Sequence, residues 1–165
     1  MWNLCRIDGF LKIVDRLRKR AGNISISTDI IVGYPTETVE DFELTRKVFK
    51  EAAFDMAFIF KYSPRAGTKS ALMQDDVPES EKERRNSELL SELEKTSRAY
   101  NDSFVGKVEE VLVEGAARRG ENMLMGRTRT HRKAVFKGSP DLVGKLVDVK
   151  INAATTTALE AEIVK

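Results

Sequence analysis

The stretch "DIIVGYPTETVEDF", from Asp29 to Phe42, decides the fold of the first part of this chain. An apolar run stops at Gly33, passes through a Tyr-Pro turn and restarts as an amphipathic segment. Thr38, with Asp41 three residues later, resembles a capping box and marks the start of a helix. A strand that ends in a turn before a capped helix is typical of the ligand-facing rim of an α/β barrel. We therefore expect a ligand-facing edge at this turn.

Helical and strand patterns alternate on both sides of this stretch. Residues 8–21 carry apolar side chains at helical spacing, and residues 24–32 and 54–63 have the composition of strands. A long charged helix is expected from residue 78 to residue 104. The short connections imply parallel strands. Because two strands leave sheet edges unpaired, we expect further strands from residues upstream of Met1.

The pattern changes at Phe104, where short β-like segments separated by glycines begin and continue to the end of the chain. Such a series predicts a small barrel or sandwich. We therefore divide the chain into an α/β part at residues 1–103, which includes the long connecting helix, and an all-β part at residues 104–165.

Basic residues are concentrated in the all-β part. Residues 118–137 contain seven basic residues and one acidic residue, Glu121. The basic residues are Arg118, Arg119, Arg127, Arg129, Arg132, Lys133 and Lys137. Such an excess predicts contact with a polyanion, and a solvated strand face is the alternative. If Arg127, Arg129 and His131 lie on one strand, they share a face. For Phe136 we favour a place in the barrel core over stacking on a base.

Composition excludes several classes of protein. Hydrophobic residues make up 41% of the chain and charged residues 33%, which is ordinary for a soluble protein. No run approaches the roughly 18 apolar residues of a membrane helix, and "MWNLCRIDGF" does not resemble a signal peptide. One cysteine and one histidine cannot build a zinc or iron–sulfur site unaided. We expect a cytoplasmic protein with no metal ligand and no catalytic residue in this chain, and Cys5 as an incidental thiol.

Four segments in order carry a family resemblance: "TDIIVGYPTETVEDF", "FDMAFIFKYSPRAGTKSA", "VPESEKERRNSELLSELE" and the glycine-punctuated segments after Val105. They resemble the C-terminal portion of the radical-SAM tRNA methylthiotransferases, and among them the MiaB type. The last sixty residues resemble the TRAM domain, a small RNA-binding β-barrel. The resemblance implies part of a radical-SAM (β/α) barrel followed by a TRAM domain.

The resemblance also implies a function. Enzymes of this type methylthiolate C2 of N6-isopentenyladenosine beside the anticodon, using S-adenosylmethionine and two 4Fe-4S clusters. The cluster cysteines are absent from this sequence, so we expect the chain alone to be inactive and to need an N-terminal part of the same enzyme. Its partner would be the anticodon arm of tRNA.

Cofactor contacts are expected at the rim. By position and by resemblance, the candidates for S-adenosylmethionine are Ile31, Gly33, Glu37, Tyr62 and Arg65. Ile31 would pack on the adenine and Gly33 would allow close approach, whereas Arg65 would bind a carboxylate or phosphate. The alternatives are that Ile31 simply lies in a core strand, that Glu37 lies in a capped turn, and that Arg65 is a solvated arginine without a ligand.

Two other functions stay open. The first alternative is a stand-alone, non-catalytic RNA-binding protein of the TRAM type. The second is part of a methylthiotransferase that acts on threonylcarbamoyladenosine or on a ribosomal protein. Enzymes that modify the ribosomal protein more often carry an acidic residue at the position of Arg65, so Arg65 favours a tRNA substrate.

Overall fold

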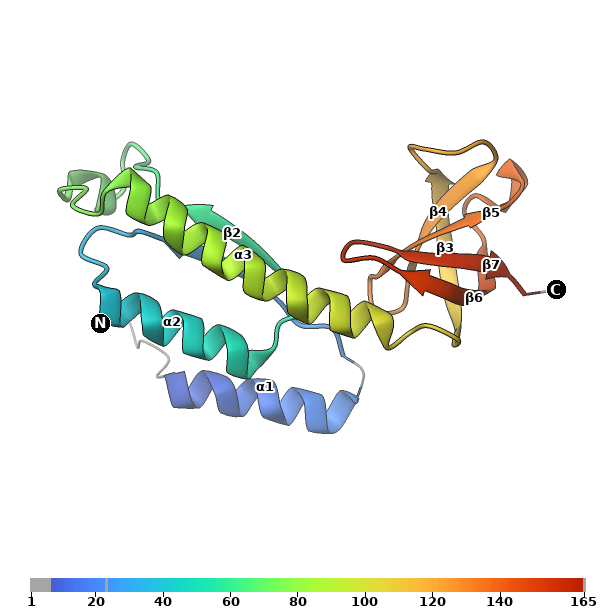
Figure 1. The fold of residues 1–165 in the computed structure, drawn as a ribbon, viewed down its shortest axis with the longest axis horizontal. Coiled ribbons are helices and arrows are strands. Elements are labelled where there is room, and N and C mark those ends of the chain that lie inside the picture. The colour runs from blue at the N-terminus through green and yellow to red at the C-terminus, as the bar shows by residue number, and fades with distance from the viewer. Residues whose placement is uncertain (1–6, 23, 165) are drawn as a thin grey trace. The chain divides into compact units, whose positions relative to one another are not determined.

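The computed structural model describes residues 7–22 and 24–164, and Cys5 lies outside this range. The chain divides into two units, residues 1–94 and residues 95–165, each with its own core. Figure 1 labels the elements. Those of the first unit are α1 (Ile7–Ala21), β1 (Ser27–Val32), α2 (Val39–Ala52), β2 (Met56–Lys61) and the larger part of α3 (Glu79–Asp102). A 3₁₀ turn at Ser70–Leu72 lies between β2 and α3.

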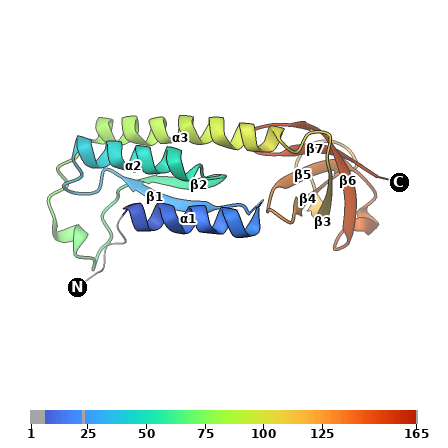
Figure 2. The ribbon, with the colours of Figure 1, turned by 90° about the horizontal axis from the view of Figure 1, so that it is seen from below.

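The first unit is built on two parallel strands. β1 pairs with β2 so that Asp29 lies beside Phe58 and Ile31 beside Phe60. The parallel pairing predicted from the helix–strand order is therefore confirmed. In Figure 2 the strands run alongside the helices α1, α2 and α3.

All three helices contribute to one core with the strands. Its fully buried members include Val32 on β1, Phe42 and Phe49 on α2, and Leu89 on α3. Side chains of the opposite sheet face are open: Ile31, Phe58 and Phe60 are each more than half exposed. Because neighbouring residues of a strand point to opposite faces, the helices cover one face and leave the other apolar and accessible.

The second unit is a closed barrel with strand order β3-β4-β5-β7-β6. Its strands are β3 (Val108–Ala116), β4 (Met123–Thr128), β5 (Lys133–Lys137), β6 (Leu146–Ala154) and β7 (Leu159–Ile163), with a 3₁₀ turn at Pro140–Leu142. All pairings are antiparallel except that of β5 with β7. The predicted order of an α/β part followed by a small β-barrel is confirmed.

Every second side chain along the barrel strands points inward and fills the interior. Leu124 on β4, Phe136 on β5, Ile151 on β6 and Leu159 on β7 point inward and are almost fully buried. The preference for Phe136 in the core is therefore confirmed. Met123 and Met125 are only half-buried and alternate with Leu124, so they face outward.

None of the helices formed by the described residues has the length and apolar content that spanning a membrane requires.

Candidate functional site

A pocket of about 400 Å³ opens where β1 and β2 end. Three of the five residues predicted to contact a cofactor line it: Ile31, Tyr62 and Arg65. The remaining lining residues come from the same strand ends and from the segment that follows β2: Tyr34, Phe60, Lys61, Ser63, Thr68 and Ser70. The C-terminal ends of parallel strands thus form a concave surface, as expected for an α/β rim.

Two tyrosine rings in the lining of this pocket contact each other. The rings of Tyr34 and Tyr62 meet edge to face, with centroids 5.3 Å apart. Tyr62 is only 8% exposed, and its hydroxyl has no hydrogen-bond partner within the described residues. A buried hydroxyl without a partner is costly, so a ligand that bonds to it would stabilise the site.

Polar side chains also line the pocket. Lys61 is engaged by Glu79 and Glu83, with Nζ–Oε1 distances of 2.5 and 3.3 Å, and the hydrogen bond to Glu79 raises the pKa of Lys61. The exposed Arg65 lies in the loop after β2, and no ion pair engages its guanidinium within the described part of the chain. The pocket lining therefore combines aromatic surface with a guanidinium available to an anion.

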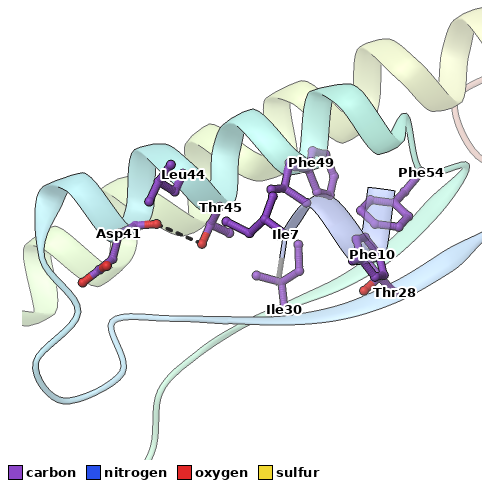
Figure 3. A pocket seen from close by; sticks show the side chains of 10 residues that line it. Ile7, Phe10, Thr28, Ile30, Asp41, Leu44, Thr45, Phe49 and Phe54 are labelled. Carbon is purple, nitrogen blue, oxygen red and sulfur yellow. Dashed lines mark hydrogen bonds between the residues drawn. The ribbon is translucent and has the colours of Figure 1, made fainter. Parts of the chain in front are cut away.

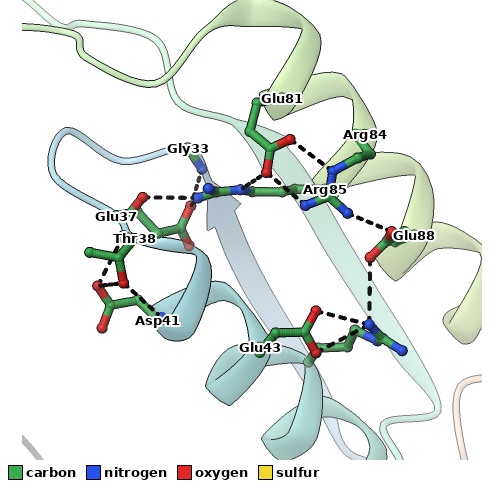
Figure 4. Close-up of polar contacts among 10 residues, drawn as sticks. Gly33, Glu37, Thr38, Asp41, Glu43, Glu81, Arg84, Arg85 and Glu88 are labelled. Carbon is green, nitrogen blue, oxygen red and sulfur yellow. Dashed lines mark hydrogen bonds and ion pairs between the residues drawn. The ribbon is translucent and has the colours of Figure 1, made fainter.

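The other two predicted cofactor residues, Gly33 and Glu37, do not line the pocket. The Gly33 N–H donates to Oε2 of Glu37 at 2.5 Å, and Nη1 of Arg85 donates to the same oxygen at 2.7 Å (Figure 4). The Glu37 carboxylate thus binds groups of its own chain. Sequence patterns did not indicate this role, because its partner Arg85 lies 48 residues away.

A second pocket, of about 380 Å³, lies between α1, α2 and β1 (Figure 3). Its lining is mainly apolar and includes Phe10, Ile30 and Phe49. The hydroxyl of Thr45 at its wall donates to the carbonyl oxygen of Asp41 at 3.1 Å. Neither the residue types nor their contacts indicate a reaction at this second pocket.

The predicted basic surface divides into two groups at opposite ends of the β4–β5 hairpin. The pairing places Lys137 beside Met123 at one end and Lys133 beside Arg127 at the other. Arg118 and Arg119 lie in the connection before β4, at the Lys137 end.

The two groups differ in their local partners. At the Lys133 end, Arg127 pairs with Glu114 at 3.2 Å and Arg129 with Glu110 at 2.6 Å. The guanidinium of Arg132 stacks 4.4 Å from the ring centroid of Tyr100. For Arg118, Arg119 and Lys137, as for Lys133, no ion pair is found among the described residues, so the group at the Lys137 end is the less compensated of the two.

The condition under which Arg127, Arg129 and His131 would share a strand face is not met. β4 ends at Thr128, and a turn follows in which the His131 N–H bonds to the Thr128 carbonyl oxygen and His131 has a φ of 61°. The Thr128 hydroxyl also accepts the Arg132 N–H at 3.1 Å. A hydroxyl that satisfies the backbone locally competes with continuation of the strand.

No group of His, Cys, Asp or Glu that could hold a metal ion occurs within residues 7–22 and 24–164.

Residues 102–164 match the TRAM domain family. Over 153 residues, 93% of the chain, the sequence is 46% identical to the tRNA-2-methylthio-N(6)-dimethylallyladenosine synthase of Clostridium botulinum (strain Okra / Type B1). It is 44% identical over 96% of its length to the protein of that name from Alkaliphilus oremlandii, and 46% identical over 93% to that from Opitutus terrae.

These matches cover only part of each relative. The chain spans about a third of their length, namely 34%, 34% and 32%. The resemblance to a C-terminal portion of such enzymes, predicted from four sequence segments, is confirmed.

Proposed function

We propose that this chain supplies part of an S-adenosylmethionine pocket and the RNA-binding domain of a radical-SAM tRNA methylthiotransferase. The parent enzyme would methylthiolate C2 of N6-isopentenyladenosine next to the anticodon. One observation carries the proposal: a rim pocket lined by Ile31, Tyr62 and Arg65 precedes, in one chain, a barrel that matches the TRAM family. The relatives' names supply the reaction.

The chemistry of the pocket fits S-adenosylmethionine. An adenine can pack against Ile31 and the Tyr34 and Tyr62 rings, which present apolar and aromatic surface. The Tyr62 hydroxyl is available to a polar atom of the ligand. Arg65 can bind the carboxylate of the methionine part with its two-pronged guanidinium. When bound, S-adenosylmethionine would supply the radical and the methyl group; these residues would orient it.

The two 4Fe-4S clusters belong, in this proposal, to the N-terminal two-thirds of the parent. Cysteine thiolates are the ligands of such clusters, and this chain contains a single cysteine. In this division residues 1–103 complete a radical-SAM partial barrel, residues 104–165 form the TRAM domain, and the enzyme works in the cytoplasm.

The anticodon arm of tRNA would bind to the outer surface of the barrel. The seven basic residues between 118 and 137 can contact phosphates, whose binding weakens steeply as the salt concentration rises. Met125 and Val135 lie beside one another on the outward face of β4 and β5, between the two basic groups. Such apolar side chains can contact unstacked bases of a loop.

A chimera tests this function. This chain replaces the matching third of the Clostridium botulinum relative, and the tRNA of a host that lacks the endogenous enzyme is analysed for 2-methylthio-N6-isopentenyladenosine by mass spectrometry. We expect the modified nucleoside with the chimera and none with this chain alone. An inactive chimera that folds and carries both clusters would overturn the proposal.

A second candidate is a stand-alone RNA-binding protein. The closed barrel favours it, because every strand from β3 to β7 has two neighbours and needs no further chain to complete it. In that case the chain would bind the anticodon arm, and a folded chimera would show no methylthiolation for Arg65→Glu to remove. An active chimera that loses activity in Arg65→Glu supports the enzyme.

A further inference from the structure

Two cations on the first turns of α3 are buried. Lys82 and Arg85 are each only 3% exposed, although both types of residue are almost never buried without a partner. The Lys82 Nζ donates to both carboxylate oxygens of Asp75, at 2.7 and 2.6 Å. The Arg85 Nε donates to Oε1 of Glu81 at 2.8 Å, which holds the guanidinium from its own helix.

Arg85 reaches the loop after β1, residues 33–38. Its Nη1 donates to Oε2 of Glu37 at 2.7 Å and to the Glu37 carbonyl oxygen at 3.1 Å. Because the same Oε2 accepts the Gly33 N–H, Arg85 fixes both ends of this loop through one carboxylate (Figure 4).

Lys82 reaches the same loop at Gly33. A Cβ on Gly33 would lie 2.3 Å from Cγ of Lys82, so the lysine stem packs directly on the glycine. The Lys82 Nζ lies 5.5 Å from the ring centroid of Tyr62. Tyr62 in turn contacts Tyr34, and both rings line the rim pocket.

We propose that Lys82 and Arg85 are positioning residues for the rim pocket. Neither lines the pocket; they hold the 33–38 loop and the Tyr62 ring in the arrangement that receives the ligand. The choice of S-adenosylmethionine as that ligand rests on the proposed function.

Stability alone does not explain the two cations. Apolar side chains of similar volume often replace buried ion pairs without loss of stability. What an apolar side chain cannot do is direct Glu37 toward the Gly33 N–H. A preorganised wall raises affinity because less ordering remains to be done when the ligand binds.

The variants Lys82→Met and Arg85→Met keep the stems and remove the charges. Arg84→Met is the matched control: Arg84 lies beside Arg85 and bonds to Glu81 and Glu88, not to the 33–38 loop. Amide exchange at Gly33 is measured by NMR in this chain, and S-adenosylmethionine binding by equilibrium dialysis in the chimera. We expect roughly tenfold faster exchange at Gly33 in Arg85→Met. Affinity should fall about tenfold in both test variants, with neither change in the control.

Unchanged exchange at Gly33 in Arg85→Met would overturn the proposal, as would unchanged affinity in both variants. If the chimera does not bind S-adenosylmethionine while exchange at Gly33 still rises in Arg85→Met, the proposed ligand is wrong and the holding of the loop stands. If Arg85→Met does not fold, Glu37→Gln keeps the side-chain size and faces the same two measurements.

Discussion

Gly126 on β4 has no room for a side chain. A Cβ there would lie 2.3 Å from the carbonyl oxygen of Leu112 and 2.5 Å from Cγ1 of Val111. The oxygen belongs to the backbone of the paired strand β3, so it cannot rotate away as a side chain would. Gly126→Ala should therefore lower the free energy of unfolding of the barrel by about 1–3 kcal/mol, as overpacking does. Urea unfolding followed by circular dichroism measures this.

Gly115 on β3 offers the control for Gly126. A Cβ at Gly115 would meet no atom within 4 Å, and its φ is not in the left-handed region. Gly115→Ala should leave the free energy of unfolding within about 0.5 kcal/mol of the wild type. Equal losses in the two variants would contradict the steric explanation.

Glu81 gives α3 a pH-dependent contribution to stability. Hydrogen bonds from Arg84 and then Arg85 lower the pKa of Glu81 to about 2, from 4.5. Because the folded-state pKa lies below the unfolded one, this contribution is fully present above pH 4.5 and is lost as the pH falls to about 2. Glu81→Gln should be less stable than the wild type at pH 6, and the difference should shrink between pH 4.5 and 2.

Denaturant unfolding at several pH values measures that difference. Glu94→Gln, which changes an exposed glutamate of the same helix, serves as the control. A gap between wild type and Glu81→Gln that stays constant down to pH 2 would contradict the pairing of Glu81 with the two arginines.

At the scale of elements, α2 depends on its first turn. The Thr38 hydroxyl accepts the Asp41 N–H at 3.1 Å, and the Asp41 carboxylate accepts the Thr38 N–H at 3.1 Å (Figure 4). Thr38→Ala should cost about 0.5–2 kcal/mol in the free energy of unfolding of the first unit. Thr38→Ser, which keeps the hydroxyl, should lose much less of the free energy of unfolding than Thr38→Ala. Hydrogen exchange of the α2 amides provides the measurement, and equal effects of Ala and Ser would argue against the cap.

Elements were predictable from sequence where local chemistry determines them. The capping box at Thr38 and the strands around Ile31 and Phe136 follow from short patterns of capping, alternation and turn residues. A strand that continues through Arg129 was a condition of the shared basic face, and the Thr128 hydroxyl closes a turn before it. The partner of Glu37 was out of reach for a different reason: contacts 48 residues apart depend on how α3 packs, which no local pattern encodes.

For the whole molecule, the division of basic residues into two groups predicts unequal contributions to RNA binding. Charge reversal at Arg118, Arg119 and Lys137 should weaken binding to an anticodon stem-loop and reduce the salt slope by about 0.7 per lost phosphate contact. Reversal at Arg127, Arg129 and Lys133 should do less, because Glu114 and Glu110 already pair with two of these residues. Fluorescence anisotropy at several salt concentrations measures both slopes. If neither charge reversal changes the salt slope, the RNA binds elsewhere on the chain.

The two units should also differ in local stability. β1 and β2 have only each other as partners, whereas every strand of the barrel has two. The two-stranded sheet depends on the helices that pack on one of its faces, and its exposed Ile31, Phe58 and Phe60 gain nothing from burial. Amides of β1 and β2 should therefore exchange faster than those of β3 to β7 in hydrogen-exchange mass spectrometry of this chain. In the chimera, neighbouring strands would cover the open edges, so β1 should become protected while the barrel stays unchanged. Equal protection of both units in the chain alone would mean that the first unit is a complete domain, which would remove the physical argument for a larger barrel around it.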